Sequence, residues 1–532
     1  MVGNMEVEII TKLAFNSPMA TTTYGAIDTT QPIRTRRLAC GVATLIAIAI
    51  SSLTFCYWYF DFPRQLIIQA PVDDGPESSI VAELHVRPQQ VHLAYAGTKT
   101  GTGMTISWTT YHRIRDSAVW FNSETFNSTE QLTPQMASIH SYYSDDSYTL
   151  FTYHVTLTNL EPKTVYYYQV GSLANVTRRS SVFHFRTARP SSDNHSFEML
   201  MYADFGERNA ESTVTFVSSL KDRLDLIWHV GDISYADNAF HTLDQDANAL
   251  GFVYEKAYNA WMNALQSTMQ EIPYMTTVGN HEAECYSPAC MYSEVKQLQL
   301  SNYSAYNTRF RMPSEESNGS HNMWYSWNHG PIHFISVSSE TDFPGAPTNN
   351  KGTKVENGHF GDQLAWLEAD LVKANASRHN HPWIIVGSHR PIYGLKVFKA
   401  SGHPKNKQKA ILNAFEHLFL KFKVDMVVSG HQHAYERHLP IANGIPIMDG
   451  VSEDKRVYNN PQAPVYLVSG SCGSTDGHEP YENIPNQLWN VLYDNTHYGV
   501  SLLKANRSTL YWSFVDSATG QSLDQFELHK PN

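Results

Sequence analysis

The pattern of apolar and polar residues divides the chain into two regions of different character, which meet near residue 190. From residue 86 to residue 190, short runs of alternating apolar and polar residues are separated by turn-forming residues. This period of two is typical of half-buried strands in an all-β fold. The clearest predicted strands are Gln90–Tyr95, Met104–Trp108, Tyr153–Leu157, Val165–Val170 and Val182–Arg186. We therefore predict a β-sandwich over residues 86–190.

Beyond residue 195, apolar runs end in polar clusters and are followed by stretches of helical periodicity. Strands that alternate with helices indicate an α/β domain built in layers. The predicted strands are Met199–Ala203, Leu226–Val230, Tyr274–Val278, Trp383–Val386 and Met426–Val428, and the predicted helices are Tyr254–Met269, Gln363–Ala374 and Gln408–Phe422. The segment 464–528 returns to strands. We predict an α/β domain over residues 195–532, with β-sheets flanked by helices.

One segment near the amino end has the length and composition of a membrane span. Residues 38–60 contain no charged side chain, three arginines precede them at 34, 36 and 37, and an aromatic cluster lies near their end. The positive flank predicts that residues 1–37 are cytosolic and that everything after the span is extracellular or luminal. Residues 61–85, with several prolines, are expected to form a tether. A cleaved signal peptide, which would make the protein secreted, is the competing interpretation.

The distribution of glycosylation sequons agrees with this orientation. Seven N-x-S/T sequons follow the apolar segment and none precedes it. They are predicted glycosylation sites at Asn127, Asn175, Asn194, Asn302, Asn318, Asn375 and Asn506.

Charge and cysteine content narrow the class of protein further. The net charge of −12 argues against a nucleic-acid binder that neutralises phosphates. Five cysteines are too few for a scaffold built from disulfides. We predict a local disulfide between Cys285 and Cys290, in preference to a zinc site, and a buried free thiol at Cys472.

Residues with metal-binding chemistry directly follow the predicted strands of the second region. Open α/β sheets place their ligands at the carboxyl ends of strands. The five clusters are Asp204-Phe205-Gly206, Gly231-Asp232-Ile233-Ser234-Tyr235, Gly279-Asn280-His281-Glu282, Gly387-Ser388-His389 and Gly430-His431-Gln432-His433. A single such cluster could arise by chance, but five clusters in this order predict a metal centre.

This series of motifs, D-x-G, G-D-x-x-Y, G-N-H-E, V-x-x-H and G-H-x-H, resembles that of the purple acid phosphatases in the metallophosphoesterase superfamily. The resemblance extends over nearly the whole chain after residue 60. It implies a fibronectin-III-like β-sandwich at the amino end, as in the larger plant-type members, followed by a metallophosphoesterase catalytic domain.

The resemblance also implies a binuclear centre of Fe(III) and a divalent metal. Asp204, Asp232, Tyr235 and His433 would hold the ferric ion. Asp232 would bridge to zinc, manganese or ferrous iron, completed by Asn280, His389 and His431. Hard carboxylate and phenolate oxygens suit Fe(III), whereas imidazole and amide groups suit the divalent ion. A phenolate from Tyr235 on Fe(III) would give the protein its colour.

The implied activity is hydrolysis of small-molecule phosphate monoesters, as an acid phosphatase with a metal-bound hydroxide as nucleophile. His281, beside Asn280, is the predicted proton donor or phosphate contact. A phosphodiesterase, nucleotide pyrophosphatase or phytase with the same metals is an alternative, and a non-catalytic surface recognition protein is another. We expect no nucleic-acid partner and allow for a homodimer.

Two short segments near the predicted ligands carry further expectations. Plant-type relatives carry a histidine pair about ten residues after the V-x-x-H histidine, where this chain has Phe398 and Lys399; Lys396, Lys399 or His403 could replace that pair. Glu436 and Arg437 are expected to form an ion pair that holds the loop of His433.

Overall fold

The computed structural model describes residues 85–142, 144–145, 148–241, 253–286, 293–484 and 486–531. The predicted cytosolic segment, the span at 38–60 and all of the tether except its last residue lie outside these ranges, as does Cys290. Within the described ranges, no helix combines the length and the apolar character needed to cross a bilayer.

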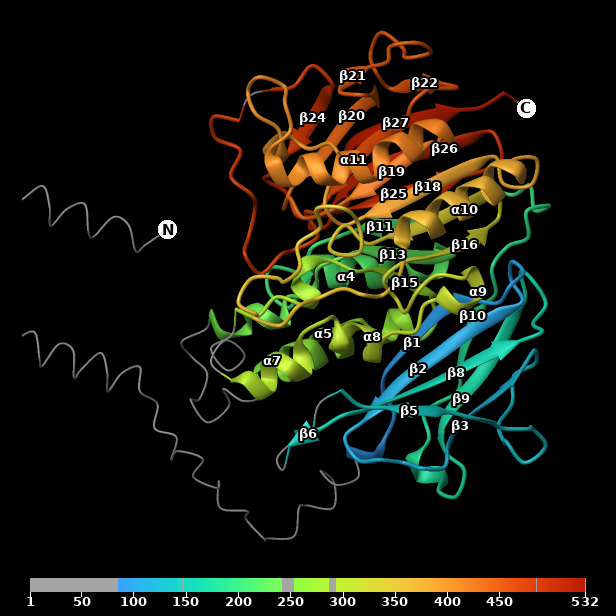
Figure 1. The fold of residues 1–532 in the computed structure, drawn as a ribbon. Helices are drawn as coiled ribbons and strands as arrows, with labels where there is room; N and C mark the ends of the chain where they lie inside the picture. The colour runs from blue at the N-terminus through green and yellow to red at the C-terminus, as the bar shows by residue number, and fades with distance from the viewer. Residues whose placement is uncertain are drawn as a thin grey trace, which may run out of the picture. The chain divides into compact units, whose positions relative to one another are not determined.

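Two four-stranded antiparallel sheets form the first region, shown in blue and cyan in Figure 1. One sheet has the order β1 (Gln89–Ala96), β2 (Gly103–Thr110), β8 (Phe151–Thr158) and β5 (Ser138–His140), and the other has β10 (Phe183–Arg186), β9 (Val165–Ser172), β3 (Ser117–Asn122) and β4 (Gln135–Met136). Trp108 on β2 stacks on Tyr153 of β8 with ring centroids 5.3 Å apart, and both are fully buried. The predicted β-sandwich is confirmed.

Two larger sheets form the second region. The seven-stranded sheet runs β15 (Tyr274–Thr277), β13 (Leu226–Val230), β11 (Phe197–Tyr202), β25 (Gly499–Ala505), β26 (Thr509–Asp516), β27 (Ser522–His529) and β22 (Val457–Asn459). The other runs β16 (Tyr325–His329), β17 (Ile332–Val337), β18 (Trp383–Ser388), β19 (Met426–Ser429), β23 (Val465–Ser469), β20 (Tyr435–Ala442) and β21 (Ile445–Pro446), and β24 (Asn490–Asp494) also pairs with β20. The short strands β12 (Phe205–Gly206) and β14 (Ile233–Ser234) pair separately, as do β6 (Ser144–Asp145) and β7 (Tyr148–Thr149).

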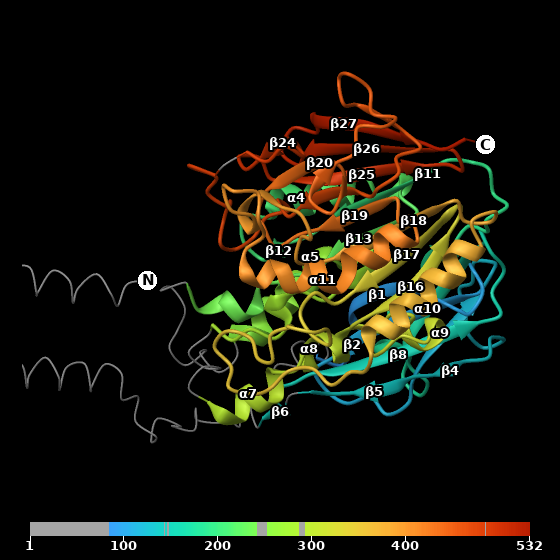
Figure 2. The ribbon, with the colours of Figure 1, turned by 45° about the horizontal axis from the view of Figure 1, so that its top comes forward.

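Helices cover these sheets, as Figure 2 shows for the pair α10 and α11. The helices are α4 (Glu211–Ser219), α5 (Val253–Met269), α7 (Glu294–Leu300), α8 (Ser304–Arg309), α9 (Ser314–Ser317), α10 (Gln363–Ala376) and α11 (Asn406–Lys421). Apolar residues of α10 and α11, such as Leu367 and Phe415, share one buried cluster with Ile384 and Val386 of β18. Ile385, which points to the opposite face of the same strand, belongs to the other cluster. Burial on both faces explains the nearly continuous apolar sequence of this parallel strand.

The direction of the strands determines where polar side chains can gather. Strands β11, β13 and β15 are mutually parallel, and so are β17, β18, β19 and β23. Parallel neighbours deliver the loops that follow them to the same edge of their sheet. All five predicted metal-binding clusters follow such strands.

A buried ion pair joins the β-sandwich to the helices of the second region. Arg309 of α8 lies 2.8 Å from Glu255 of α5, and both side chains are almost completely buried. The same guanidinium donates to Gln90 of β1 and to Asn259 of α5, at 3.1 and 2.9 Å. Removing one member of such a pair leaves an uncompensated buried charge, which is strongly destabilising.

We therefore expect Arg309→Ala to lower the free energy of unfolding by about 3–5 kcal/mol. Arg311→Ala is the matched control, because Arg311 pairs with Glu315 and Glu316 near the surface and should contribute about 1 kcal/mol or less. Denaturant unfolding of both variants measures the difference. An Arg309→Ala loss no greater than that of the control would contradict the role of this ion pair.

Candidate metal centre

The loops that carry the predicted ligands have a strained backbone. Asp204, Asp232, Tyr235 and His431 all adopt positive φ angles, of 61°, 56°, 53° and 68°. This conformation costs a non-glycine residue of order 1–3 kcal/mol and occurs mainly where the surrounding structure enforces it for function. Part of that enforcement comes from the pairing of β12 with β14, which ties the loop after Asp204 to the loop after Asp232.

Two glycines allow these loops to approach one another closely. Gly231 has a φ of 86°, and a Cβ atom there would lie 2.5 Å from Nδ1 of His389. A Cβ atom on Gly430 would lie 2.5 Å from a carboxylate oxygen of Asp204. A side chain at either position would therefore displace a predicted ligand.

Asp204, Tyr235 and His433 meet in one buried group. The Tyr235 hydroxyl donates to Oδ1 of Asp204 at 3.0 Å and lies 2.9 Å from Nε2 of His433. It also lies 3.5 Å from Oδ2 of Asp232. These are the four residues predicted to hold Fe(III), and the structure brings all of them together.

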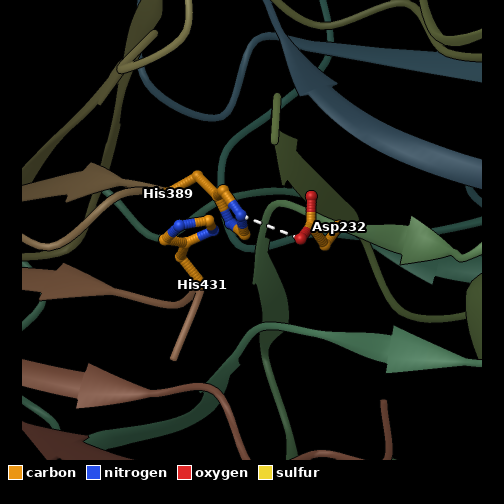
Figure 3. Close-up of side chains that lie close together, drawn as sticks. All are labelled: Asp232, His389 and His431. Carbon is orange, nitrogen blue, oxygen red and sulfur yellow. Dashed lines mark ion pairs between the residues drawn. The ribbon is translucent and has the colours of Figure 1, made fainter. Parts of the chain in front are cut away.

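Asp232, His389 and His431 form the adjoining group, shown in Figure 3. Their potential ligand atoms all lie within 4.8 Å of one another. Nε2 of His389 is 3.0 Å from Oδ2 of Asp232 and 3.3 Å from Oδ1 of Asn280. Asp232 thus contacts both groups, as a bridging ligand must. All seven predicted ligands converge in space, although they span some 230 positions of the sequence.

The electrostatics of the cluster favour a bound cation. Burial raises the pKa of Asp204 to about 8, and the nearby Asp232 carboxylate adds to the shift. Burial alone would also raise the pKa of Asp232, but His389 holds it well below its ordinary value. Burial raises the pKa of the Tyr235 hydroxyl well above its ordinary value. Metal ions would stabilise these groups as carboxylates and phenolate, which are the forms that bind metals.

The orientation of two histidines also fits a metal centre. Nδ1 of His389 is 3.0 Å from the carbonyl oxygen of Val230, and Nδ1 of His433 is 3.0 Å from that of Gly477. A backbone carbonyl can only accept, so each Nδ1 carries the proton and each Nε2 presents a lone pair to the cluster. Metal-binding histidines are commonly oriented in this way. The residues present therefore fit the predicted metal pair.

His281 lies at the edge of the cluster, with Nε2 3.9 Å from Oδ2 of Asp232. Its Nδ1 is 2.8 Å from a carboxylate oxygen of Asp237. Burial would lower the pKa of His281, but Asp237 and then Asp232 raise it well above its ordinary value. Asp237 was not among the residues predicted from the sequence. Its position two residues after Tyr235 could have identified it, because a carboxylate buried beside a ligand loop requires a polar or charged partner.

Asp237, His281 and Glu284 also have potential ligand atoms within 4.8 Å of one another. Asp237 and His281 are both buried, and they contact each other directly. This contact orients the His281 ring with Nε2 towards Asp232.

Glu282 connects two of the ligand loops through the backbone. Its carboxylate accepts from the amides of Asp232, Ile233 and Gly279, at 3.1, 2.8 and 2.6 Å. This triple contact fixes the Asp232 loop against the Asn280 loop.

The expected ion pair between Glu436 and Arg437 is wrong. Neighbouring residues on a strand point to opposite faces, and both lie on β20. Arg437 instead pairs with Asp524 at 2.6 Å, whereas Glu436 accepts from the Tyr481 hydroxyl and from the Leu395 amide.

A further pair that sequence reasoning missed lies beside His431. Nη1 of Arg390 is 2.7 Å from Nε2 of His431, and Nε donates to the fully buried carboxylate of Glu340 at 2.9 Å. Arg390 directly follows His389, so this guanidinium extends the V-x-x-H cluster. Nothing in the sequence pointed to Glu340 as part of the site, because it follows β17 and no predicted ligand follows that strand.

The structure also locates the predicted modification sites. Four sequon asparagines are exposed and three are partly buried: Asn127, Asn194, Asn318 and Asn375 in the first group, and Asn175, Asn302 and Asn506 in the second. Cys472 is a buried free thiol, as predicted. Cys285 is disulfide-bonded, and because Cys290 lies outside the described residues, their pairing stays a prediction.

Three known families match the sequence in consecutive segments. Residues 88–187 match the "Purple acid Phosphatase, N-terminal domain", and residues 191–435 match the "Calcineurin-like phosphoesterase". Residues 463–525 match the "Iron/zinc purple acid phosphatase-like protein C". These segments include the β-sandwich and all seven predicted metal ligands.

Similar proteins extend over most of the chain. It is 31% identical to mouse acid phosphatase type 7, over 75% of this chain and 81% of that protein. It is 28% identical to an acid phosphatase of Aspergillus ficuum, over 88% of this chain and 90% of that protein. It is 26% identical to the Fe(3+)-Zn(2+) purple acid phosphatase 12 of Arabidopsis thaliana, over 90% of this chain and 92% of that protein. Among solved structures, a purple acid phosphatase from yellow lupin seeds has the same fold, with a TM-score of 0.64 at 21% identity over 84% of this chain and 74% of that one.

The contacts around His389 lead to a prediction about metal content. We expect His389→Ala and Asn280→Ala each to reduce the bound divalent metal by at least half, because each removes a donor atom beside Asp232. His195→Ala is the control, since this exposed histidine pairs with Asp193 before β11, at the end of that strand opposite to Asp204. Elemental analysis of the purified variants measures the outcome. Unchanged metal content in both site variants would reject the assignment.

Proposed function

Because the chain belongs to the purple acid phosphatase family, we propose that it is an acid phosphatase that hydrolyses small phosphate monoesters at this centre. The observation that carries the proposal is the convergence of Asp204, Asp232, Tyr235, Asn280, His389, His431 and His433 in one buried cluster. An intact set of donors favours catalysis over a purely structural role for the domain.

We further propose that the cluster holds Fe(III) together with a divalent metal. A relative that is named for Fe(3+) and Zn(2+) supports this pair. Asp204, Tyr235 and His433 supply the donors suited to the ferric ion, and Asn280, His389 and His431 supply those suited to the divalent ion, with Asp232 between them. When bound, such a metal pair polarises the phosphate ester and lowers the pKa of water.

The protein's own groups position the substrate and supply a proton. His281 is assigned as the donor to the oxygen of the departing alcohol, through Nε2, because Nδ1 is engaged by Asp237. Asp237 is assigned as a positioning residue, since it acts on the reaction only through the His281 ring. The guanidinium of Arg390, next to His431, is placed to contact a phosphate oxygen.

Hydrolysis of p-nitrophenyl phosphate by the purified protein tests the proposal. We expect His281→Gln to lower kcat by about 10²–10⁴-fold without loss of metal, because a general acid contributes that much. His359→Gln is the matched control, because this histidine is exposed and its ring pairs with the exposed Glu356 at 3.5 Å. A His281→Gln enzyme with normal kcat would reject the role of His281, and a metal-loaded wild-type protein without activity would reject the phosphatase.

We also propose that the protein is a glycosylated single-pass membrane protein whose catalytic part lies outside the cytosol. The uncharged segment 38–60, its arginine flank and the seven sequons that follow it support this orientation. The surface position of several sequon asparagines, such as Asn127 and Asn375, allows glycans to be attached without disturbing the core.

Enzymatic removal of N-glycans should therefore lower the apparent mass of the full chain made in a eukaryotic secretory pathway. Sequencing the mature amino terminus separates a retained anchor from a cleaved signal peptide. An unchanged mass after deglycosylation would contradict the orientation. The mass of the native protein in solution shows whether it is a monomer or a homodimer.

A further inference from the structure

A cavity of about 460 Å³ lies beside the metal centre. Its lining includes two residues of the centre, His431 and Arg390, and three lysines, Lys399, Lys405 and Lys407. The remaining residues of the lining are uncharged. The volume is within the range of small-molecule sites, roughly 300–1,000 Å³.

The charge of this cavity is positive and largely uncompensated. No aspartate or glutamate is among the lining residues. Arg390 is paired with Glu340, but within the described ranges no carboxylate lies within ion-pair distance of Lys399, Lys405 or Lys407. Lys396, a nearby cation, pairs instead with Glu479 and does not line the cavity. Among the described residues, the three ammonium groups of the cavity therefore lack a carboxylate counterion.

The start of helix α11 adds to this positive character. Lys405 is the residue before the first turn, and no side chain accepts a hydrogen bond from the first-turn amides. The first turn contains Lys407 and no acidic residue. Helices usually carry acidic or hydroxyl side chains at this end, because the unpaired amides and the helix dipole make it positive. Lysines here oppose the stability of the helix, and a bound anion would offset that cost.

The cavity shares two residues with the predicted reaction centre, His431 and Arg390. His431 belongs to the group of potential metal ligands, and Arg390 contacts its ring at 2.7 Å. A phosphate ester bound at the metals would therefore have the three exposed lysines of this cavity on the side of His431. An ordinary monoester with an uncharged alcohol makes no use of three such ammonium groups.

We propose that this cavity binds a second phosphate group of the substrate, so that the preferred substrates are small molecules with more than one phosphate. The inference rests on the proposed phosphatase function and specifies its substrate class. Lys399, Lys405, Lys407 and the amino end of α11 bind the second phosphate, while the ester to be cleaved lies at the metals. Arg390 lines the cavity and contacts His431, so it belongs to both sites.

Matched substrates test the proposal in the metal-loaded full chain. Adenosine 5′-monophosphate and adenosine 3′,5′-bisphosphate share the 5′ ester and differ by the 3′ phosphate. Cleavage of the 5′ ester is monitored by the formation of adenosine from the first and of adenosine 3′-monophosphate from the second. We expect kcat/KM for the bisphosphate to exceed that for the monophosphate by about tenfold or more, mainly through a lower KM. The Lys399→Gln, Lys405→Gln, Lys407→Gln triple variant should reduce this ratio to near one.

Lys409→Gln is the matched control. Lys409 lies on the same helix and is exposed, but it does not line the cavity. This variant should keep the wild-type ratio, which separates a specific contact from a general effect of charge. The triple variant should be folded and no less thermally stable than the wild type, because the lysines at the amino end of α11 oppose the helix dipole.

Several outcomes would overturn the proposal: a wild-type ratio near one, a ratio unchanged in the triple variant, or an equal decrease in the ratio with Lys409→Gln. A clear preference for an acidic phosphopeptide over the bisphosphate would likewise overturn the assignment to small molecules.

Failure of the proposed function gives a different result, since the wild type then hydrolyses neither nucleotide. In that case, calorimetric binding of inorganic triphosphate still tests the cavity: weaker binding in the triple variant but not in Lys409→Gln supports it, and equal binding rejects it.

Discussion

The structure depends on placing two carboxylates, Asp204 and Asp232, side by side where almost no water reaches them. Protein groups alone compensate this poorly, since burial and mutual proximity keep the pKa of Asp204 raised to about 8. A pair of multivalent cations resolves the conflict, and the surrounding features are consistent with that solution. The strained backbone, the close glycines and the oriented imidazoles all bring donor atoms towards one point. The fold supplies the rigidity that these unfavourable local conformations require.

Rigidity comes from links between loops as well as from the sheets below them. The pairing of β12 with β14 connects the loops of the two aspartates, and Glu282 connects one of them to the Asn280 loop. The centre is therefore a unit in which each loop limits the movement of its neighbours. Phosphate chemistry benefits from this arrangement, because donors that are already in place need no reorganisation during the reaction.

Much of this arrangement could be predicted from the sequence. The buried parallel strands produced clear apolar runs, and polar clusters followed them directly, so the layers and the position of the site were predictable from the pattern. The choice of the seven donors within those clusters came from the resemblance to the purple acid phosphatases. Elements with weaker patterns were harder to recognise, such as the short edge strands β4 and β5. Contacts made by single residues far apart in sequence were not predictable, as Arg390 with Glu340 and Asp237 with His281 illustrate. The expected Glu436–Arg437 pair failed because adjacency in sequence was taken for adjacency of side chains on a strand.

The joint between the β-sandwich and the second region has a practical consequence. Gln90 of the sandwich contributes to the polar environment of Arg309, and Tyr142 donates to Glu255 at 2.6 Å. The β-sandwich is thus part of the solvent barrier around an ion pair that belongs to the neighbouring domain. A recombinant fragment that begins after residue 190 would open this ion pair to water along one side. The shortest fragment that retains the whole polar joint begins at β1 rather than at the first strand of the metal-binding region.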